Sequence, residues 1–215
     1  MLRRRRLYTT SVGVLSKGMA RMQALLTLVL FTLSGFPLHL QDSSVEIAKQ
    51  QIAAGNEIEA RRLLEQVLTR EPRDPQANFW MGYLHLKAYE YEPAIACLEV
   101  PGEKSREPDR LKLLAKAQIL SGKSLEAENS LREVIRLRSG DAEGWSLLGQ
   151  LYQTQNRFGE ALKPLQTAIA LNKMDVPGLT ALAFTEFALG KASKAEETFR
   201  QAIRENGRLA RPLAD

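Results

Sequence analysis

Cys97, His39 and His85 are the side chains of this sequence best suited to nucleophilic or acid–base chemistry. A cysteine nucleophile needs a base such as histidine within hydrogen-bonding distance. Cys97 is the only cysteine, and it lies at helical spacing from Ala94 and Leu98, which favours a buried structural thiol. No histidine can be placed beside it from the sequence. We therefore expect neither a Cys–His nor a Ser–His catalytic site.

The spacings that metal and nucleotide sites require are also missing. One cysteine and two histidines do not form the ligand pairs of a zinc site. Neither G-x-x-x-x-G-K-[ST] nor G-x-G-x-x-G, the glycine-rich phosphate-binding patterns, occurs. Acidic pairs such as Glu126/Glu128 and Glu196/Glu197 are typical of solvated helix faces. We expect no enzymatic activity, no metal and no cofactor.

The positive charge of the chain is concentrated at its N-terminus. The formal net charge is +5, yet residues 1–40 hold six basic residues and no acid. Without those six, 24 of the 30 basic residues remain against 25 acidic ones, a balance of −1. Nucleic-acid-binding proteins carry a basic patch or stripe that this remainder lacks. We therefore expect no nucleic-acid partner.

Residues 1–40 have the layout of a targeting segment. A basic start is followed by the short apolar run ALLTLVLFTL at residues 24–33, and then by Gly35 and Pro37. That order is typical of a secretory signal peptide, although no A-x-A cleavage site follows. The prediction is a periplasmic or secreted protein whose signal peptide occupies residues 1–40.

Two alternatives to a cleaved signal remain open. The apolar run is shorter than the roughly 20 residues of a membrane span, but extended over residues 22–40 it could act as an uncleaved anchor in the inner membrane. An Arg-rich, acid-free start is also typical of a mitochondrial presequence. Met19 or Met22 could be the true start, which would shorten the basic region.

The elements that must position any site follow a repeating helical pattern. The clearest unit, residues 142–175, places Trp145, Leu148, Gly149 and Tyr152 on one face of a first helix, and Ala161, Leu165 and Ala168 on one face of a second. Asn156 and Arg157 mark the turn between the two helices. The pattern recurs in phase over five units, 41–74, 75–107, 108–141, 142–175 and 176–209, of which only 75–107 is one residue short.

This pattern resembles the tetratricopeptide repeat (TPR), a 34-residue helix–turn–helix unit with a W-x2-L-G-x2-Y…A-x3-F…P signature. The resemblance implies an all-α solenoid of antiparallel helix pairs, a TPR superhelix with a concave surface. Small residues at the Gly149 and Ala161 places would let the two helices of each unit approach closely. Residues 210–215 are expected to form a flexible tail.

Two places depart from the regular pattern. Pro101 and Gly102 stand where the second helix of the second unit should end, so we expect a truncated helix and a loop through Pro101–Glu107. After Glu205 the sequence NGRLARPLAD is too short and broken to form a capping helix. Phe199 and Ile203 would then be exposed, and this uncapped end is a candidate surface for self-association.

The resemblance implies that the first helices line a groove that binds a peptide segment of a protein partner. By phase, the groove residues are Phe79, Trp80, Tyr83, Lys87, Lys112, Leu113, Lys116, Ser146, Gln150, Gln153, Thr180, Phe184 and Phe187. Aromatics beside lysines suit a segment with apolar anchors and some acidic groups. The alternative is that Trp80 and Phe187 pack between repeats and that the lysines form a solvated face. No asparagine pair accompanies Lys112 and Lys116, which argues against the carboxylate clamp of chaperone-binding members.

The function that this pattern predicts is a non-catalytic protein–protein interaction module or scaffold, acting in the cell envelope or after export. The alternative is a structural subunit that self-associates or docks through its uncapped C-terminal repeat. The sequence does not identify the partner.

Overall fold

The structure is a computed structural model that describes residues 38–102 and 107–209. Within those ranges all regular secondary structure is α-helical, as the repeat pattern predicts. Residues 1–37 of the predicted targeting segment and the predicted tail at 210–215 lie outside the described residues. None of the helices in the described ranges is both long and apolar enough to cross a bilayer.

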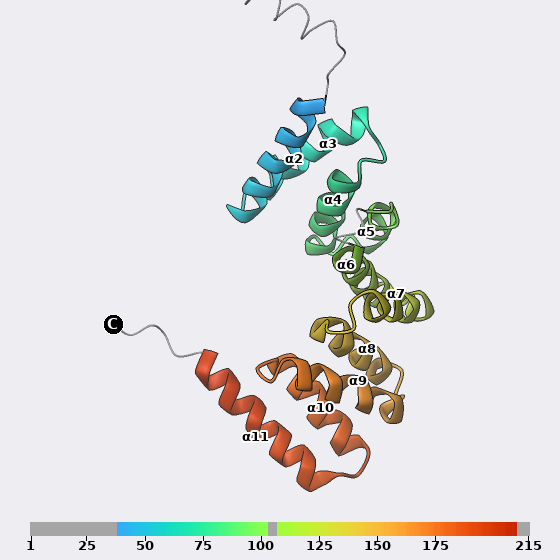
Figure 1. Ribbon diagram of the computed structural model, residues 1–215, viewed down its shortest axis with the longest axis vertical. Coiled ribbons are helices and arrows are strands. Elements are labelled where there is room, and N and C mark those ends of the chain that lie inside the picture. The colour runs from blue at the N-terminus through green and yellow to red at the C-terminus, as the bar shows by residue number, and fades with distance from the viewer. Residues whose placement is uncertain (1–37, 103–106, 210–215) are drawn as a thin grey trace, which may run out of the picture. The chain divides into compact units, whose positions relative to one another are not determined.

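Ten helices follow one another in the described chain (Figure 1). They are α2 (Leu38–Ala53), α3 (Glu57–Arg70), α4 (Pro75–Lys87), α5 (Tyr91–Leu98), α6 (Glu107–Leu120), α7 (Ser124–Leu137), α8 (Ala142–Thr154), α9 (Phe158–Leu171), α10 (Val176–Ala188) and α11 (Ala192–Leu209). The array from Ile47 onward forms one compact unit, distinct from a first unit at Met1–Glu46. Everything described below belongs to the second unit.

Helices pack in consecutive pairs, α4 with α5, α6 with α7, α8 with α9 and α10 with α11 (Figure 1). Each pair also contacts the next one along the chain. In addition α4 contacts α6, α6 contacts α8 and α8 contacts α10, so these first helices of successive pairs are direct neighbours. Among the described residues, the second helices α5, α7, α9 and α11 make no such contacts with one another.

Small residues explain how closely the two helices of a pair approach. Ala94, Ala127 and Ala161 have no exposed surface. A Cβ atom at Gly149 would lie only 2.4 Å from Cγ of Leu165, so no larger residue fits there without a shift. Leu165 is itself fully buried, in a core that α7, α8 and α9 share. This close packing is the expected role of the small positions.

A residue with a left-handed backbone lies two positions after the end of each first helix. Gly55, Gly122 and Gly190 have φ values of 80°, 80° and 74°, and Asn156 has 58°. Asn156 lies in the turn that the sequence predicts for the fourth unit, and Gly122 and Gly190 lie 34 residues before and after it. Glycine adopts this conformation without a Cβ penalty, and asparagine is among the residues that tolerate it. The turn after α4 differs, because Tyr89 takes the left-handed conformation there with φ 61°.

The second helix of the second pair is truncated, as Pro101 predicts. α5 has eight residues and ends at Leu98, whereas α7 and α9 have 14 each. The buried Arg110 of α6 donates a hydrogen bond to the Leu98 carbonyl at this end, and it also donates to the Glu107 carboxylate. A side chain from the next helix thus satisfies a backbone acceptor that a longer α5 would have satisfied itself.

The last helix, α11, continues through Asn206 and Gly207 to Leu209. Asparagine and glycine cost at most about 1 kcal/mol each relative to alanine in a helix, whereas only proline stops one firmly. The division of the array into five units with the bounds given above stays a prediction.

Candidate peptide-binding surface

The thirteen predicted groove residues lie on four first helices that are direct neighbours, α4, α6, α8 and α10. We call the side of these helices that carries them the first-helix surface. The nine of them that are predicted to bind the peptide are Phe79, Trp80, Tyr83 and Lys87 on α4, Lys112 and Lys116 on α6, Gln150 on α8, and Phe184 and Phe187 on α10. Their role in binding stays a prediction, but their surroundings differ along the surface.

The aromatic residues of α4 form a half-buried cluster. The ring centroids of Phe79 and Trp80 are 5.1 Å apart and those of Trp80 and Tyr83 are 5.9 Å apart, both edge-to-face. The indole N–H of Trp80 is buried without a hydrogen-bond partner. Lys87 Nζ lies 5.9 Å from the centroid of the Tyr83 ring and is ion-paired with Glu57 of α3. The cluster therefore packs largely on itself.

Lys112 connects α6 to the beginning of α8. Its Nζ lies 3.1 Å from Asp141 Oδ2 and 3.0 Å from Glu143 Oε2, and its side chain is only 13% exposed. It also lies 3.3 Å from Asp109 Oδ1 on its own helix. Burial alone would lower the pKa of Lys112, but the carboxylates of Glu143 and Asp141 outweigh burial and raise it. Its charge is already matched inside the protein.

Lys116 is also paired inside the protein. Its Nζ lies 2.6 Å from Glu143 Oε1, so Glu143 accepts hydrogen bonds from both lysines of α6. Burial would raise the pKa of Glu143, but the hydrogen bonds from Lys116 and Lys112 outweigh it and lower the pKa. The lysines thus join neighbouring repeats. This differs from the expectation that they are free to meet acidic groups of a partner.

The polar residues of α8 are also engaged within the array. Gln150 donates a hydrogen bond of 3.0 Å to the Ser146 hydroxyl on its own helix. Gln153 donates bonds of 2.7 Å to both the Ala181 carbonyl and the Thr185 hydroxyl of α10. Gln153 therefore ties the fourth pair to the fifth.

Phe184 and Phe187 differ from the other members, because they are large, apolar and open to solvent. Phe184 is 51% exposed and Phe187 is 64% exposed. They lie three residues apart on α10 and therefore on one side of that helix. The ring centroid of Phe158, at the start of α9, is 6.0 Å from that of Phe184. No charged residue of α10 accompanies them at the surface, since its one acid, Glu186, is fully buried.

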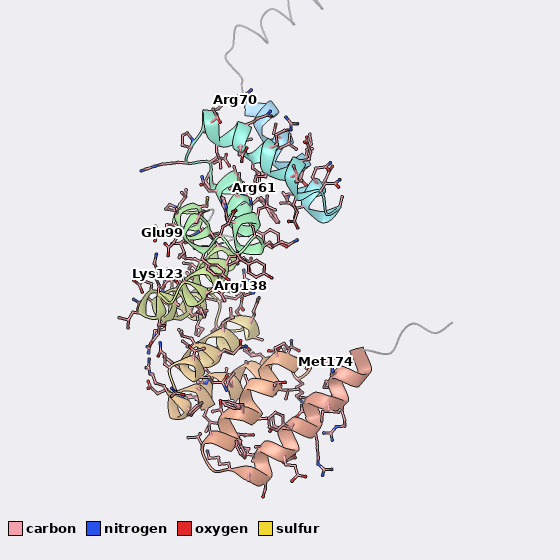
Figure 2. All side chains as sticks on the ribbon, turned by 180° about the vertical axis from the view of Figure 1, so that it is seen from behind. Arg61, Arg70, Glu99, Lys123, Arg138 and Met174 are labelled. Atoms are coloured by element: carbon pink, nitrogen blue, oxygen red, sulfur yellow. The ribbon has the colours of Figure 1, made fainter. Side chains whose placement is uncertain are left out.

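Sequence reasoning missed the acidic partners of the α6 lysines. Asp141 is the last residue of the third unit and Glu143 the second residue of the fourth, and Asp141 also accepts a hydrogen bond of 2.8 Å from the Gly144 N–H as the N-cap of α8. Figure 2 labels Arg138, which lies 3.1 Å from Asp109 and 3.4 Å from Asp141 in the same network. The spacing of 31 residues between Lys112 and Glu143, close to one repeat, is the signal that could have found this pair.

Cys97 and His85, the candidates for chemistry, lie in ordinary structural surroundings. Cys97 is half-buried, and burial raises the pKa of its thiol, which disfavours the reactive thiolate. His85 is half-buried too, and its Nδ1 lies 2.5 Å from Glu90 Oε2 and 3.3 Å from Arg61. Across the described residues, no group of three His, Cys, Asp or Glu side chains is arranged to hold a metal ion.

Comparisons with known proteins agree with this architecture. Residues 113–173 match the family profile described as tetratricopeptide repeat. That match supports the resemblance of this chain to tetratricopeptide repeat proteins. Residues 55–134 match the profile of anaphase-promoting complex, cyclosome, subunit 3. A TPR repeat-containing protein of Dictyostelium discoideum is 27% identical over 117 residues, which are 50% of this chain and 44% of that protein. The chain thus matches less than half the length of this curated relative.

Several solved structures, two of them named as TPR proteins, are similar to this chain in fold. The crystal structure of MamA has a TM-score of 0.68 at 17% identity, covering 76% of this chain and 96% of that one. TTC0263, a thermophilic TPR protein of Thermus thermophilus, has a TM-score of 0.60 at 20% identity, covering 77% and 91%. YrrB, a TPR protein with an unusual peptide-binding site, has 0.63 at 16% identity, covering 75% and 84%. At these identities the likeness concerns the fold alone.

Proposed function

We propose that this protein is a non-catalytic scaffold that holds a peptide segment of a protein partner on its first-helix surface. The observation that carries the proposal is the exposure of Phe184 and Phe187 on one side of α10, 51% and 64%. Large exposed aromatic side chains are enriched at protein interfaces and are costly to leave in water. The TPR fold, which is built for protein–protein interaction, supports the proposal, as does the peptide-binding site named for the structural neighbour YrrB.

The charges of the surface favour an apolar rather than an acidic segment. Lys87, Lys112 and Lys116 are each ion-paired with carboxylates of the same chain. A partner carboxylate would have to displace those pairs, and exchanging one exposed ion pair for another yields little free energy. Phe184 and Phe187 require no such exchange. The bound segment therefore inserts apolar side chains beside α10.

Peptide display followed by affinity measurement tests this function. Peptides selected on the full chain should bind a variant with Phe184→Ala and Phe187→Ala about 30-fold more weakly, since truncating a binding hot spot costs about 2 kcal/mol or more. Leu125→Ala is the matched control, because Leu125 is 74% exposed but lies on the second helix α7. Equal binding by the double variant, or an equal loss with Leu125→Ala, would contradict the proposal.

A second function is favoured by the end of the array. Ile203 is 71% exposed and Phe199 is 37% exposed on α11, the last helix described. The residues at the place of Ile203 in earlier pairs, Ile135 and Ile169, are partly buried in the shared core. This alternative is a structural subunit that self-associates or docks through the C-terminal repeat. Light scattering at several protein concentrations tests it, since Ile203→Asp should then reduce the assembled mass.

The cell envelope, or export beyond it, is the location that we propose from the N-terminal pattern. Residues 22–40 would then be either part of a cleaved signal or a membrane anchor, and mitochondrial import is the alternative. Fractionation combined with N-terminal sequencing of the mature protein tests this. A mature chain that begins at Met1 and stays in the cytosolic fraction would exclude all three.

A further inference from the structure

A cleft opens between the second helices α7 and α9, away from the first-helix surface. In the described chain no Cα atom of α7 lies within 8 Å of one in α9, whereas α6, α8 and α10 contact one another in turn. The resulting space has a volume of about 630 Å³, and α8 supplies its floor. That is within the range of roughly 300–1,000 Å³ typical of ligand sites.

The floor of the cleft is apolar and firmly held. Leu148 and Tyr152 of α8 are 5% and 4% exposed, and they belong to the core of this part of the array. Trp145 is half-buried, and its indole N–H donates a hydrogen bond of 2.9 Å to the Ser139 carbonyl, which fixes the ring. Pro164 of α9 completes the lining on the opposite wall. A large apolar side chain inserted here would meet preformed apolar surface.

Gly159 lies at the start of α9 and lines the cleft. A Cβ atom built on it would have no neighbour within 4 Å. The corresponding residue in the third pair, 34 residues earlier, is Leu125, whose side chain is 74% exposed. A larger side chain at position 159 is therefore compatible with the backbone packing of this pair.

The rim of the cleft is positively charged. Of its four charged lining residues, Arg132, Arg136 and Lys163 are cationic and only Glu160 is acidic. Both oxygens of Glu160 accept hydrogen bonds from Arg157, at 2.7 and 2.6 Å. Arg132 and Arg136 are paired with Glu128 and Glu133 of α7. The ammonium of Lys163 is exposed, and among the described residues it has no ion-pair partner.

We propose that this cleft binds an acidic peptide segment of a partner protein, with one large apolar side chain on the α8 floor and a flanking carboxylate at Lys163, the lining cation that has no ion-pair partner among the described residues. The apolar floor favours a large apolar side chain, and the exposed ammonium of Lys163 favours a carboxylate beside it. A basic or uncharged segment would leave the charge of Lys163 without a partner. The site goes beyond the proposed function, because it uses different helices and a segment of opposite character from the apolar one expected beside α10.

The test uses a pool of fluorescein-labelled hexapeptides, Glu-Asp-X-X-Asp-Glu, in which X is Leu, Ile, Met, Phe or Trp. Fluorescence anisotropy with the full chain should detect binding, and a pool with Gln and Asn in place of Glu and Asp should bind at least about tenfold more weakly. No binding of the acidic pool, or equal binding of the amide pool, overturns the proposal.

Two variants locate the binding. Gly159→Leu adds a large side chain to the lining of the cleft and raises helix propensity, and Lys163→Glu reverses the charge at the rim. Each should weaken binding of the acidic pool about tenfold or more. Ser193→Leu adds the same side chain at the corresponding place of α11, and Lys173→Glu reverses a charge beyond the far end of α9; both should bind like wild type. Wild-type binding by Gly159→Leu, or equal losses in the controls, would refute the site.

Two further measurements distinguish peptide binding in this cleft from peptide binding on the first-helix surface and from self-association of the chain. The variant with Phe184→Ala and Phe187→Ala should bind the acidic pool normally, whereas a loss there would assign the peptide to the first-helix surface and overturn the inference. Light scattering should give the same mass for wild type and Gly159→Leu. A wild-type dimer that Gly159→Leu dissociates would mean that a second copy of the chain occupies the cleft, which also overturns it.

Discussion

The α4–α5 and α8–α9 pairs bring their helices together in the same way but differ in the length of the second helix. A Cβ atom at Gly82 would lie 2.6 Å from Cγ of Leu98, and one at Gly149 would lie 2.4 Å from Cγ of Leu165. Both leucines are fully buried. Yet α5 has eight residues and α9 has 14. The close approach of the two helices is thus the same in both pairs, although the second helix is much shorter in the α4–α5 pair.

This difference shows that the point where the two helices cross is the constant part of a repeat. The turns of the second helix beyond that point can be lost, and their role in the packing can be taken over by other residues. In the α8–α9 pair, α9 continues past Leu165 and packs Ile169 against Gly178 of the next pair. In the α4–α5 pair the helix ends at Leu98, and Arg110 of α6 reaches back to donate a hydrogen bond to the buried Leu98 carbonyl. A buried hydrogen bond from a charged group is strong enough to take over such a role.

The largest effect is expected from filling the crossing point of the regular pair. Gly149→Val would place a branched side chain against Leu165 and 3.3 Å from the Ala161 carbonyl, which belongs to the backbone and cannot move alone. We expect a loss of about 3 kcal/mol in the free energy of unfolding, the upper part of the range for overpacking. Urea unfolding followed by circular dichroism measures it.

Gly82→Val is the matched change in the truncated pair. Its close neighbours are all side-chain atoms of Leu98, the last residue of α5. Because a helix end can shift more easily than a helix interior, we expect a smaller loss of about 1–2 kcal/mol. Equal losses for the two variants would show that helix length has no influence on how a crossing point adapts.

The next largest effect is expected at Arg110, whose hydrogen bond to the Leu98 carbonyl compensates for the missing turns of α5. Arg110→Met keeps the aliphatic volume but removes the hydrogen bonds to Leu98 and Glu107. Hydrogen bonds to charged groups contribute about 1.5–3 kcal/mol when buried, so we expect a loss of about 2 kcal/mol. Urea unfolding measures it, and hydrogen exchange should show faster exchange in α5 than in α9.

Arg136→Met is the control for Arg110. Arg136 has the same relation to a glutamate three residues earlier, but its side chain is 68% exposed. Exposed ion pairs contribute little to stability. A loss with Arg136→Met as large as with Arg110→Met would show that the ion pair on α6, and not the hydrogen bond to Leu98, explains the effect.

A smaller effect, which is stabilising, is expected in the turns between the two helices of a pair. Tyr89 is 78% exposed and holds a left-handed backbone at φ 61°. Such a conformation costs about 1–2 kcal/mol for a residue with a Cβ. Tyr89→Gly should therefore raise the free energy of unfolding by about 1 kcal/mol, or the melting temperature by about 2–4 °C. Thermal unfolding measures this.

Asn156→Gly is the matched turn variant in the α8–α9 pair. Asparagine tolerates the left-handed region, so the gain should be only a few tenths of a kcal/mol. If both variants gave the same gain, the strain at Tyr89 would not differ from that at Asn156, and the turn would not be a weak point of the truncated pair.

The sequence predicts the repeating architecture because that architecture depends on local spacing. Gly149, Ala161 and Leu165 recur as residue types at fixed intervals, and Gly55, Gly122 and Gly190 mark turns that need a positive φ. Pro101 predicts the early end of α5 for the same local reason. α11 continues through Asn206 and Gly207 to Leu209, because these two residues weaken a helix and do not stop it.

The surfaces are harder to predict, because they depend on pairs of residues from different repeats. The phase of the pattern identifies Lys112 and Lys116, but only the structure reveals that Glu143 of the next helix pairs with both. Likewise the cleft that Gly159 lines depends on the separation of α7 and α9, which no local sequence pattern contains.

The smallest effect is a pH dependence that separates the two parts of the Arg110 interaction. The hydrogen bond from Arg110 lowers the pKa of Glu107 below its usual value of about 4.3. A carboxyl group whose pKa is lower in the folded state stabilises the fold above its unfolded pKa, and this contribution is lost as the pH falls through the folded value. The loss caused by Arg110→Met should therefore shrink below about pH 4.3. It should not vanish, because the bond to the Leu98 carbonyl does not titrate. Urea unfolding of wild type and Arg110→Met between pH 7 and pH 3 measures how the difference in their free energies of unfolding changes with pH. A difference that stays constant would mean that the Glu107 carboxylate contributes nothing to the stabilising effect of Arg110.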